Sequence, residues 1–348
     1  MAKVTIKDVA REAGVSVGSV HLAINSKSGI TKKNRDHILE VANNLGYKPN
    51  ILARNLKREI RNIAVVLPRK DDRSIYYYDY MWRAVEDFQS IASDYNLNIV
   101  KYEYSNFSKT LGLVDLSSIS GLITVGYPEE HYKEAISRVC HKGIPVILID
   151  CDFKDSSRIC CIKPDSRIIG RLTGELLVKT IHRMDGQILV CGGDRNYSNH
   201  YEIVNSLLEY FNEMGIGNRL MVEYFWKIEE ESEKIITRAL KNNNIVGCCS
   251  VNSRSTVALS QGIIKNGMSQ KIPVIGNGIF SHSIKFMKEG VITAIIDKRP
   301  YEQCYKALET MSDLLVKNNS PSEEIVDIGV DVIFKSLLEQ YEKKALKI

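Results

Sequence analysis

The sequence of 348 residues has no run that approaches the roughly twenty apolar residues of a membrane span, and its amino terminus has no apolar signal core. We therefore expect a soluble, cytoplasmic protein with no membrane partner. Its eight cysteines form no C-x-x-C pair and no Cys/His spacing typical of zinc. Most lie in apolar runs such as Ile188–Cys191, where cysteine acts as a small buried hydrophobe, so we expect a reduced compartment and no metal.

Patterns of catalysis are also missing. Two glycine clusters that follow apolar runs, Cys191–Asp194 and Gly276–Gly278, continue neither to G-x-G-x-x-G nor to a P-loop. The seven histidines are scattered, without the spacing of a catalytic triad or a metal site. We therefore expect no cofactor and no enzymatic activity.

Positive charge is concentrated near the amino terminus. Through Arg61 the sequence has twelve lysines and arginines against five aspartates and glutamates, a net charge of +7, whereas the whole chain carries +5. A basic segment joined to a near-neutral remainder is typical of a module that binds a polyanion, and the phosphate backbone of DNA is the obvious one.

The same segment has the pattern of two short helices joined by a glycine turn. Residues 6–13 carry apolar side chains at i, i+3, i+4 and i+7, Gly14 interrupts them, and Ser16 is a good N-cap for a helix that ends near Ile24. This is the pattern of a helix-turn-helix, which lays its second helix in the major groove. A third helix is expected from the N-cap Thr31 to Gly46, and a short fourth one at 50–57 would need its target in order to form.

These residues closely resemble the headpiece and hinge of the LacI/GalR family of bacterial transcription regulators. The matching positions are Val4–Ala10, Ala13–Ser16, Asn25, Thr31, Arg35, Leu45–Asn50 and Ala53–Leu56. The resemblance covers the first sixty or so residues without a gap. It implies a homodimer, or a tetramer formed from two dimers, that binds double-stranded operator DNA under the control of a small-molecule effector.

Beyond the linker, short β-branched runs alternate with amphipathic helical stretches. Strands are expected at 62–68, 97–102, 121–125, 145–150, 187–191, 220–224, 245–250, 272–275 and 291–296, and helices at 80–95, 129–142, 166–182, 201–214, 229–241, 255–266 and 301–316. The alternation predicts an α/β fold with parallel sheets covered on both faces. The resemblance implies two Rossmann-like lobes of the periplasmic-binding-protein type, linked by three crossovers.

We therefore divide the chain into a helix-turn-helix headpiece at 1–48, a hinge helix and linker at 49–61, and a two-lobed domain for effector binding and dimerisation at 62–348. The first lobe is expected at roughly 63–162 and the second at roughly 163–292. The end of the chain then crosses back, and a terminal strand and helix are expected between Val332 and Tyr341.

The resemblance also implies which residues touch DNA. Contacts to phosphate or base edges match Thr5, Ser16, Ser19, Asn25 and Thr31, contacts near the hinge match Tyr47 and Asn50, and an apolar wedge for the minor groove matches Ala53 and Leu56. The alternative for Leu56 is a leucine that packs a helix.

The recognition helix departs from the family pattern. His21 and Leu22 stand where the family usually has Ser or Thr and then an Arg that reads guanine, and leucine cannot donate a hydrogen bond. Together with Val17 and Gly18 they form a mostly apolar surface, suited to thymine methyl groups, with His21 as the main polar reader. We therefore expect an operator that departs from the family norm at the base that arginine would read.

The effector site is less closely matched. Candidate residues are Tyr76, Tyr77 and Trp82, which offer stacking aromatics, and Asp150, Asn252, Asn277 and Asp297, which lie at strand ends. The aromatics alternatively pack the lobe or the dimer interface. The arginine expected after Asp194 is absent, and Ser253 and Asn277 replace acids of the sugar-binding pattern, which argues against a simple sugar.

We expect a sequence-specific transcriptional regulator, most simply a repressor, whose effector is a sugar or related metabolite bound between the lobes. Two alternatives stay open: a regulator whose cleft has degenerated and answers to no small molecule, and an α/β enzyme with an appended DNA-binding segment.

Overall fold

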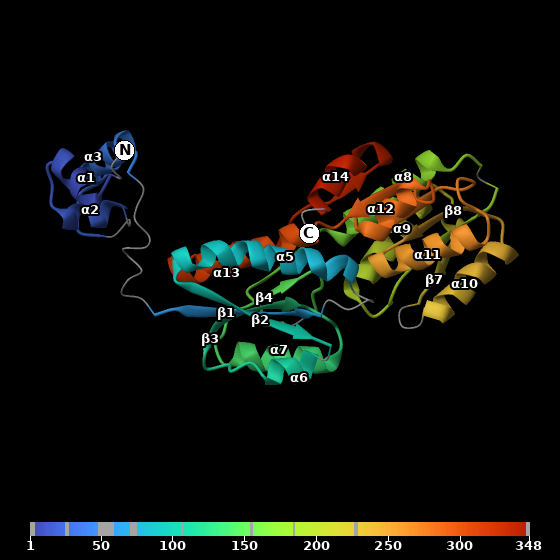
Figure 1. The fold of residues 1–348 in the computed structure, drawn as a ribbon, viewed down its shortest axis with the longest axis horizontal. Coiled ribbons are helices and arrows are strands. Elements are labelled where there is room, and N and C mark those ends of the chain that lie inside the picture. Colours follow the sequence, from blue (N-terminus) through green and yellow to red (C-terminus); the bar gives the residue numbers. More distant parts are fainter. Residues whose placement is uncertain are drawn as a thin grey trace. The chain divides into compact units, whose positions relative to one another are not determined.

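The computed structural model describes residues 4–24, 28–47, 59–69, 75–105, 107–153, 156–183, 185–225 and 229–345. The main division of the chain falls between Ile60 and Arg61, and it separates a small helical headpiece from a large body (Figure 1). The expected hinge helix at 50–57 lies outside the described residues. No helix within the described ranges is both long and apolar enough to cross a membrane.

The headpiece consists of three helices around a small apolar core. They are α1 (Ile6–Glu12), α2 (Val17–Ile24) and α3 (Lys32–Asn44). The core is formed by Val9, Ala10, Ala13, Val20, Ala23, Ile38 and Ala42. Gly14 adopts a φ of +64° in the turn between α1 and α2, and Gly46 one of +65° after α3, as expected of glycines that end helices. The three predicted headpiece helices are confirmed.

The first lobe of the body is a six-stranded sheet with helices on both faces. Its first part contains β1 (Arg61–Pro68), α5 (Ile75–Ala92), β2 (Leu97–Tyr104), α6 (Phe107–Gly112), β3 (Ile119–Val125), α7 (Glu130–His141), β4 (Val146–Ile149) and β5 (Cys160–Lys163). Later in the chain, α13 (Pro300–Lys317) and β11 (Ile325–Asp327) return to it. The strand order is β11-β5-β4-β3-β1-β2, and every pairing is parallel. Helices α5 and α13 pack on one face, and α6 and α7 cover the other (Figure 1).

The second lobe repeats this plan. It contains α8 (Ser166–Thr180), β6 (Gln187–Cys191), α9 (Ser198–Glu213), β7 (Leu220–Glu223), α10 (Glu229–Asn242), β8 (Ile245–Ser250), α11 (Ser253–Lys265), β9 (Val274–Asn277), α12 (Ser281–Lys288), β10 (Ala294–Asp297), β12 (Asp331–Ile333) and α14 (Leu338–Ala345). The strand order is β12-β10-β9-β8-β6-β7. Only the edge strand β12 runs antiparallel among the described pairings of this sheet. Short 3-10 turns occur at Ser93–Tyr95, Gly217–Arg219 and Lys335–Leu337.

The chain crosses between the lobes three times: after β5, after β10 and after β11. The two lobes of periplasmic-binding-protein type are thus confirmed, with two refinements. The second lobe continues past 292, because β10 (Ala294–Asp297) pairs with β9 in its sheet. The returning segment contributes one strand to each sheet: β11 extends the first sheet, and β12 extends the second.

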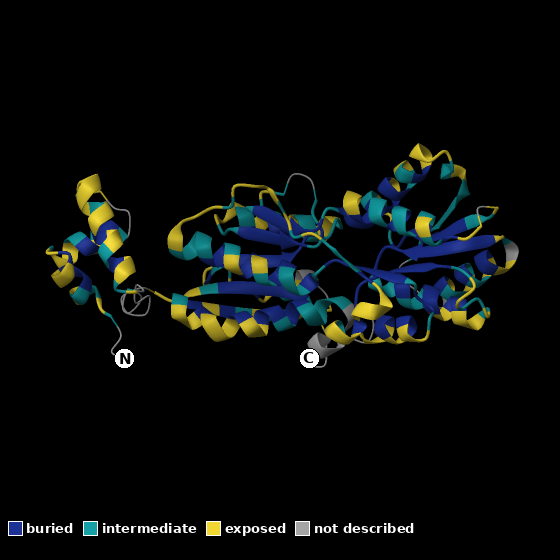
Figure 2. Cartoon of the chain, turned by 90° about the horizontal axis from the view of Figure 1, so that it is seen from above, coloured by how far each residue is buried: buried dark blue, intermediate teal, exposed yellow. Residues whose placement is uncertain are grey.

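Burial explains the pattern of the strands. The central strands of both sheets are buried on both faces, as Figure 2 shows in dark blue, which accounts for their continuous apolar runs. Four elements were not predicted: β5, β11, α6 and α12. The two strands have four and three residues and the two helices six and eight, so they are too short for periodicity to reveal. The strand expected at 272–275 begins only after Pro273, which has no N–H to donate.

Candidate DNA interface and ligand cavity

The outward face of α2 is small and apolar. Val17 is 42% exposed, Gly18 and His21 are also exposed, and Val20 and Ala23 are buried in the headpiece core. Leu22 is only half-buried, and its Cδ1 lies 3.4 Å from the position of a Cβ on Gly29. The second helix of the helix-turn-helix therefore presents few polar groups, and its roles toward bases stay a prediction.

Three of the hydroxyls expected to contact DNA cap helices. Ser16 Oγ accepts a hydrogen bond from the backbone N of Ser19 (3.0 Å) and also contacts Ser19 Oγ (2.9 Å). Thr31 Oγ1 accepts from Asn34 N (3.3 Å), and Thr5 Oγ1 donates to Asp8 Oδ2 (2.6 Å). The hydrogen bonds from Thr5 hold the pKa of the Asp8 carboxyl below its usual range. All three residues are exposed at helix amino termini, where backbone N–H groups favour phosphate oxygens.

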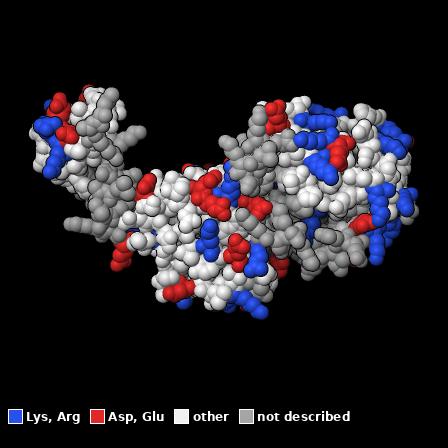
Figure 3. Space-filling model, viewed as in Figure 1, with Lys and Arg blue, Asp and Glu red and all other residues white. Residues whose placement is uncertain are grey.

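The remaining DNA-binding predictions fall on less accessible or undescribed residues. Tyr47 is half-buried and packs against the headpiece core. Asn25, Asn50, Ala53 and Leu56 lie outside the described residues. Within 4–47 there are six lysines and arginines and four acids, so most of the net charge of +7 comes from residues outside that range. The face drawn in Figure 3 accordingly shows both signs on the headpiece and on the body.

The body contains a cavity of about 360 Å³ between the two lobes, at the carboxyl ends of their parallel strands. The lining residues are Pro68, Arg69, Tyr77, Tyr78, Tyr104, Ser105, Tyr127, Tyr132 and Asp150 from the first lobe, and Tyr197, His200, Asn252, Ser253, Arg254, Asn277 and Lys298 from the second lobe and the segment that leaves it. Carboxyl ends of parallel strands are where α/β folds bind small molecules.

The first-lobe wall is built largely of tyrosines. The Tyr127 ring lies 5.1 Å from that of Tyr132 and 5.4 Å from that of Tyr197, which reaches across from the second lobe. The hydroxyls of Tyr78 and Tyr127 are hydrogen-bonded to each other. Burial raises the pKa of the Tyr77, Tyr78, Tyr104 and Tyr127 phenols well above the usual value, so these side chains stay neutral near pH 7.

Asp150 supplies the acid of this wall and is held by a chain of hydrogen bonds. It follows β4 with a φ of +62°, and its Oδ1 accepts from Tyr77 Oη (2.8 Å). Tyr77 Oη in turn accepts from Gln303 Nε2 (2.8 Å), which also donates to the backbone O of Lys298 (2.8 Å). The carboxylate therefore has a fixed position between α5 and the crossover that leads into α13.

The second-lobe wall is made of amides and cations. Asn252 caps α11, since its Oδ1 accepts from Ser255 N (2.8 Å), and its Nδ2 has no hydrogen-bond partner among the described residues. Gly193, with a φ of +68°, allows this close packing, because a Cβ there would lie 2.4 Å from Asn252 Nδ2. Burial and the nearby charge of Lys298 lower the pKa of His200 to about 3, so the ring is neutral.

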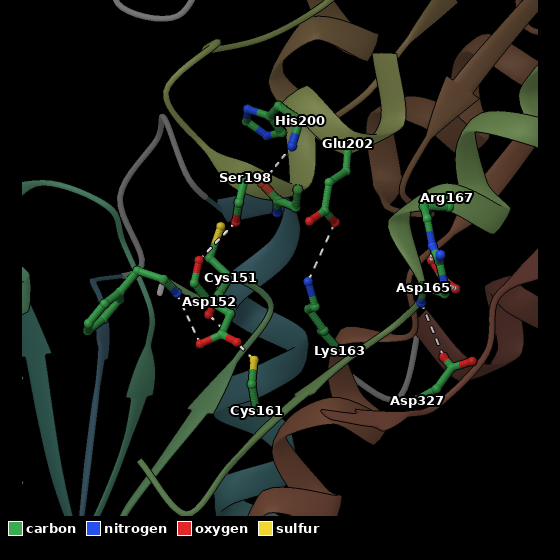
Figure 4. A network of polar contacts seen from close by, with 12 residues as sticks. Cys151, Asp152, Cys161, Lys163, Asp165, Arg167, Ser198, His200, Glu202 and Asp327 are labelled. Carbon is green, nitrogen blue, oxygen red and sulfur yellow. Dashed lines mark hydrogen bonds and ion pairs between the residues drawn. The ribbon is translucent and has the colours of Figure 1, made fainter. Parts of the chain in front are cut away.

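Direct contacts join the two lobes beside the cavity. Tyr197 Oη donates to Glu129 Oε1 (3.0 Å), and Ser198 Oγ donates to the backbone O of Asp152 (2.9 Å). Figure 4 shows Ser198 above Asp152 and the Lys163 ammonium directed at Glu202, at 3.6 Å. These contacts couple the relative position of the lobes to the shape of the cavity.

The structure brings four of the predicted effector residues to this cavity: Tyr77, Asp150, Asn252 and Asn277. Trp82 is 1% exposed, does not line the cavity, and donates from Nε1 to the backbone O of Pro68 (2.9 Å). The side chain of Tyr76 lies outside the described residues. The effector roles of all these residues stay predictions.

Asp297 lies at a second cavity, of about 210 Å³, lined also by Tyr80, Arg83 and Asp331. Its carboxylate accepts from the backbone N of Ile279 and of Arg299, both at 3.2 Å. Burial is the main cause that raises the pKa of Asp297 to about 7. This acid therefore stands apart from the tyrosine-lined cavity.

Most of the tyrosines and the cations of the cavity were not singled out from the sequence. The unpredicted lining residues include Tyr104, Tyr127, Tyr132, Tyr197, His200, Arg254 and Lys298. A signal was present, because Tyr127 and Lys298 follow β3 and β10 by one or two residues. Strand-end positions of an α/β fold are where such residues belong.

All eight cysteines are free thiols, and seven of them are buried. Burial raises the pKa of the Cys151, Cys191 and Cys248 thiols above the usual value, so these groups are protonated and serve as small apolar side chains. Within the described residues there is no cluster of three or more His, Cys, Asp or Glu side chains that could hold a metal ion.

Two family models match the sequence. Residues 5–50 match the model of bacterial regulatory proteins of the lacI family, and residues 120–319 match the model of the periplasmic binding protein domain. The first match covers the three headpiece helices, and the second spans most of both lobes.

Individual regulatory proteins are also similar to this chain. The chain is 28% identical over 222 residues to catabolite control protein A from Staphylococcus aureus (strain Mu50 / ATCC 700699), an alignment that covers 61% of this chain and 63% of that protein. It is 39% identical over 94 residues to the HTH-type transcriptional regulator RegA from Clostridium saccharobutylicum, covering 27% of each. The alignment thus spans less than two thirds of each of these relatives. A putative LacI transcriptional regulator from Bacteroides fragilis has the same fold, with a TM-score of 0.71 and 16% identity over 82% of this chain and 100% of that one.

Proposed function

We propose, from the premise that this chain belongs to the lacI family of bacterial regulatory proteins, that it binds a specific DNA sequence and represses transcription. The observation that carries the proposal is a headpiece with an exposed α2 face, joined in one chain to two lobes that enclose a cavity. A headpiece of this kind places its second helix in the major groove. The body then supplies a site whose occupancy can change the DNA affinity.

The active form is a homodimer in this proposal. Two headpieces read the two half-sites of a palindrome, because operator symmetry mirrors the two-fold symmetry of the protein. A ligand in the cavity acts through the contacts that join the lobes, such as those of Tyr197 with Glu129 and of Ser198 with Asp152. The ligand changes the DNA affinity only if it binds one relative arrangement of the lobes more tightly than another.

The base preference of α2 is tested by selecting binding sites from a random DNA pool. Leu22→Arg restores a side chain that donates two hydrogen bonds to guanine, so the selected half-site should change at one base pair toward guanine, by about 1–3 kcal/mol of discrimination. Leu39→Arg is the matched control, because Leu39 lies on α3 and is 43% exposed.

The control variant should select the same site as the unmodified chain, and circular dichroism should show that both variants keep the headpiece helices. An unchanged preference in Leu22→Arg contradicts the assignment of α2 as the reading helix. Failure of the unmodified chain to enrich any sequence contradicts the proposed function itself.

The role of the cavity is tested on the full chain by thermal shift with sugars, nucleosides and sugar phosphates. A compound that raises the midpoint and also changes DNA affinity supports a ligand-controlled regulator. Turnover of a compound would instead indicate an enzyme, and no response to any compound would indicate a cleft that has lost its ligand.

A further inference from the structure

Lys298 is a buried cation that lines the cavity between the lobes. Lys298 is 4% exposed and lies at the crossover between β10 and α13. Its backbone O accepts from Gln303 Nε2 (2.8 Å), which fixes the position of the main chain. Among the described residues, its ammonium group forms no ion pair or hydrogen bond, and it is open to the cavity.

An ammonium group that lines a cavity and has no partner from the described part of the chain is available to an anionic group of a ligand. The neighbouring acid Asp297 does not serve as that partner, because its two oxygens accept from the backbone N of Ile279 and of Arg299. The acid of the cavity, Asp150, belongs to the opposite wall, where it accepts from Tyr77. Lys298 is thus free to pair with an anionic group that enters the cavity.

A second buried donor lies on the same wall. Asn252 is 8% exposed, lines the cavity, and its Nδ2 has no hydrogen-bond partner among the described residues. It stands at the amino terminus of α11, a helix of 13 residues whose dipole adds positive potential there. A buried donor without a partner among the described residues, Asn252 Nδ2, and the cation Lys298 on the same wall are complementary to the oxygens of an anion.

We propose that the ligand of this cavity is a single-ring compound carrying one phosphate or carboxylate, with the anionic group on Lys298 and Asn252. This inference rests on the proposed function, and it names the chemical class of the effector. The tyrosine wall offers ring faces and neutral hydroxyls to the rest of the ligand, and Asp150 accepts from its hydroxyls. A volume of about 360 Å³ is near the lower end for ligand sites, which suits one ring rather than a dinucleotide.

The charge of the lining residues agrees with this class. Lys298, Arg69 and Arg254 are cationic and Asp150 is the acid, and the tyrosines and His200 are neutral. Ser253 and Asn277 are uncharged, so the second-lobe part of the described lining contains no acid.

The test is isothermal titration of the full chain with inorganic phosphate, glucose, glucose 6-phosphate and galacturonate. The two anionic sugars distinguish a phosphate from a carboxylate ligand, and glucose is their neutral counterpart. We expect at least one anion to bind at least about tenfold more tightly than glucose, and Lys298→Met to remove that difference. Lys265→Met, at the far end of α11, is the matched control and should keep it.

A second readout separates a ligand contact from a structural role. Without ligand, Lys298→Met should melt at about the same temperature as the unmodified chain, because the ammonium group has no ion pair among the described residues that the substitution would remove. A lower melting temperature, or a preference for anions that survives Lys298→Met, overturns the inference, as does tighter binding of glucose than of every anion.

DNA site selection run in parallel keeps the two proposals distinguishable. If no anion binds while the chain still enriches one DNA sequence, the inference fails and the regulator stands. If the chain enriches no sequence while an anion binds through Lys298, the inference holds and the proposed function fails.

Discussion

The two lobes of the body share one sheet plan and differ in the wall that each presents to the cavity. In both sheets the strand order is the same, with β1 to β5 matched by β6 to β10 and an edge strand from the end of the chain. Yet Asp150 directly follows β4, whereas β9, the counterpart of β4, ends at Asn277. Likewise Tyr127 follows β3, whereas Asn252 follows β8.

This difference shows that the backbone plan fixes where side chains meet, and that the residues at the strand ends decide what they bind. The first lobe contributes most of the tyrosine rings, one carboxylate and the cation Arg69, and the second contributes amides, Tyr197, His200 and the cations Arg254 and Lys298. The proposed ligand has a ring with hydroxyls toward the first wall and an anionic group toward the second. Function is thus located in a few positions on a repeated scaffold.

The largest expected effect concerns His200, which has no counterpart in the first-lobe wall. Its pKa is about 3 in the folded chain and near 6.5 when unfolded, so between these values the unfolded state binds more protons. The free energy of unfolding should therefore fall as pH decreases from 6.5 toward 3, by up to about 1.4 kcal/mol per pH unit from this residue.

Chemical denaturation measured at several pH values checks this. His200→Asn keeps an acceptor for the backbone N of Asp194 and should flatten the slope in that window, whereas the exposed His182→Asn should not. Above pH 6.5 the contribution of His200 is constant. A slope that is the same in His200→Asn and in the unmodified chain would contradict the burial of a neutral ring.

The next effect comes from adding a carboxylate to the second-lobe wall. Asn252→Asp keeps an N-cap acceptor for Ser255 N and adds a negative charge beside the anion site. We expect glucose 6-phosphate to bind about 2–3 kcal/mol more weakly, as measured by calorimetric titration. Asn252→Ser is the control, since serine caps the helix without charge. Equal losses in both variants would mean that the charge of this wall has no role.

The smallest effect comes from removing the carboxylate of the first-lobe wall. Asn tolerates the φ of +62° at position 150, so Asp150→Asn should fold normally. Inorganic phosphate should then bind about fivefold more tightly, roughly 1 kcal/mol, because a like charge is gone. Weaker binding of phosphate to this variant would show that Asp150 helps to hold the anion.

The headpiece was predictable from sequence because its determinants are local. Gly14, Ser16, Thr31 and Gly46 each mark a helix end within a few residues, and the structure places the ends there. The long strands and helices of the body were predictable for the same reason. The short elements β5, β11, α6 and α12 were not, because tertiary packing rather than periodicity stabilises them.

The cavity was only partly predictable. Asp150, Asn252 and Asn277 were found as polar residues at the ends of predicted strands. The tyrosine cluster was not, because Tyr104, Tyr127 and Tyr197 come together only through the packing of three different elements. Trp82 illustrates the converse. It is close in sequence to the lining residues Tyr77 and Tyr78, yet its ring is buried in the core and its Nε1 donates to the backbone O of Pro68.

The most direct test of the whole account is the binding of the full chain to duplex DNA, followed by fluorescence anisotropy over a range of salt concentrations. We expect the sequence enriched from a random pool to bind at least about a thousandfold more tightly than a scrambled duplex of the same length, and the preference to persist as salt weakens both. Equal affinity for the two duplexes at every salt concentration, with and without cell metabolites, would contradict it.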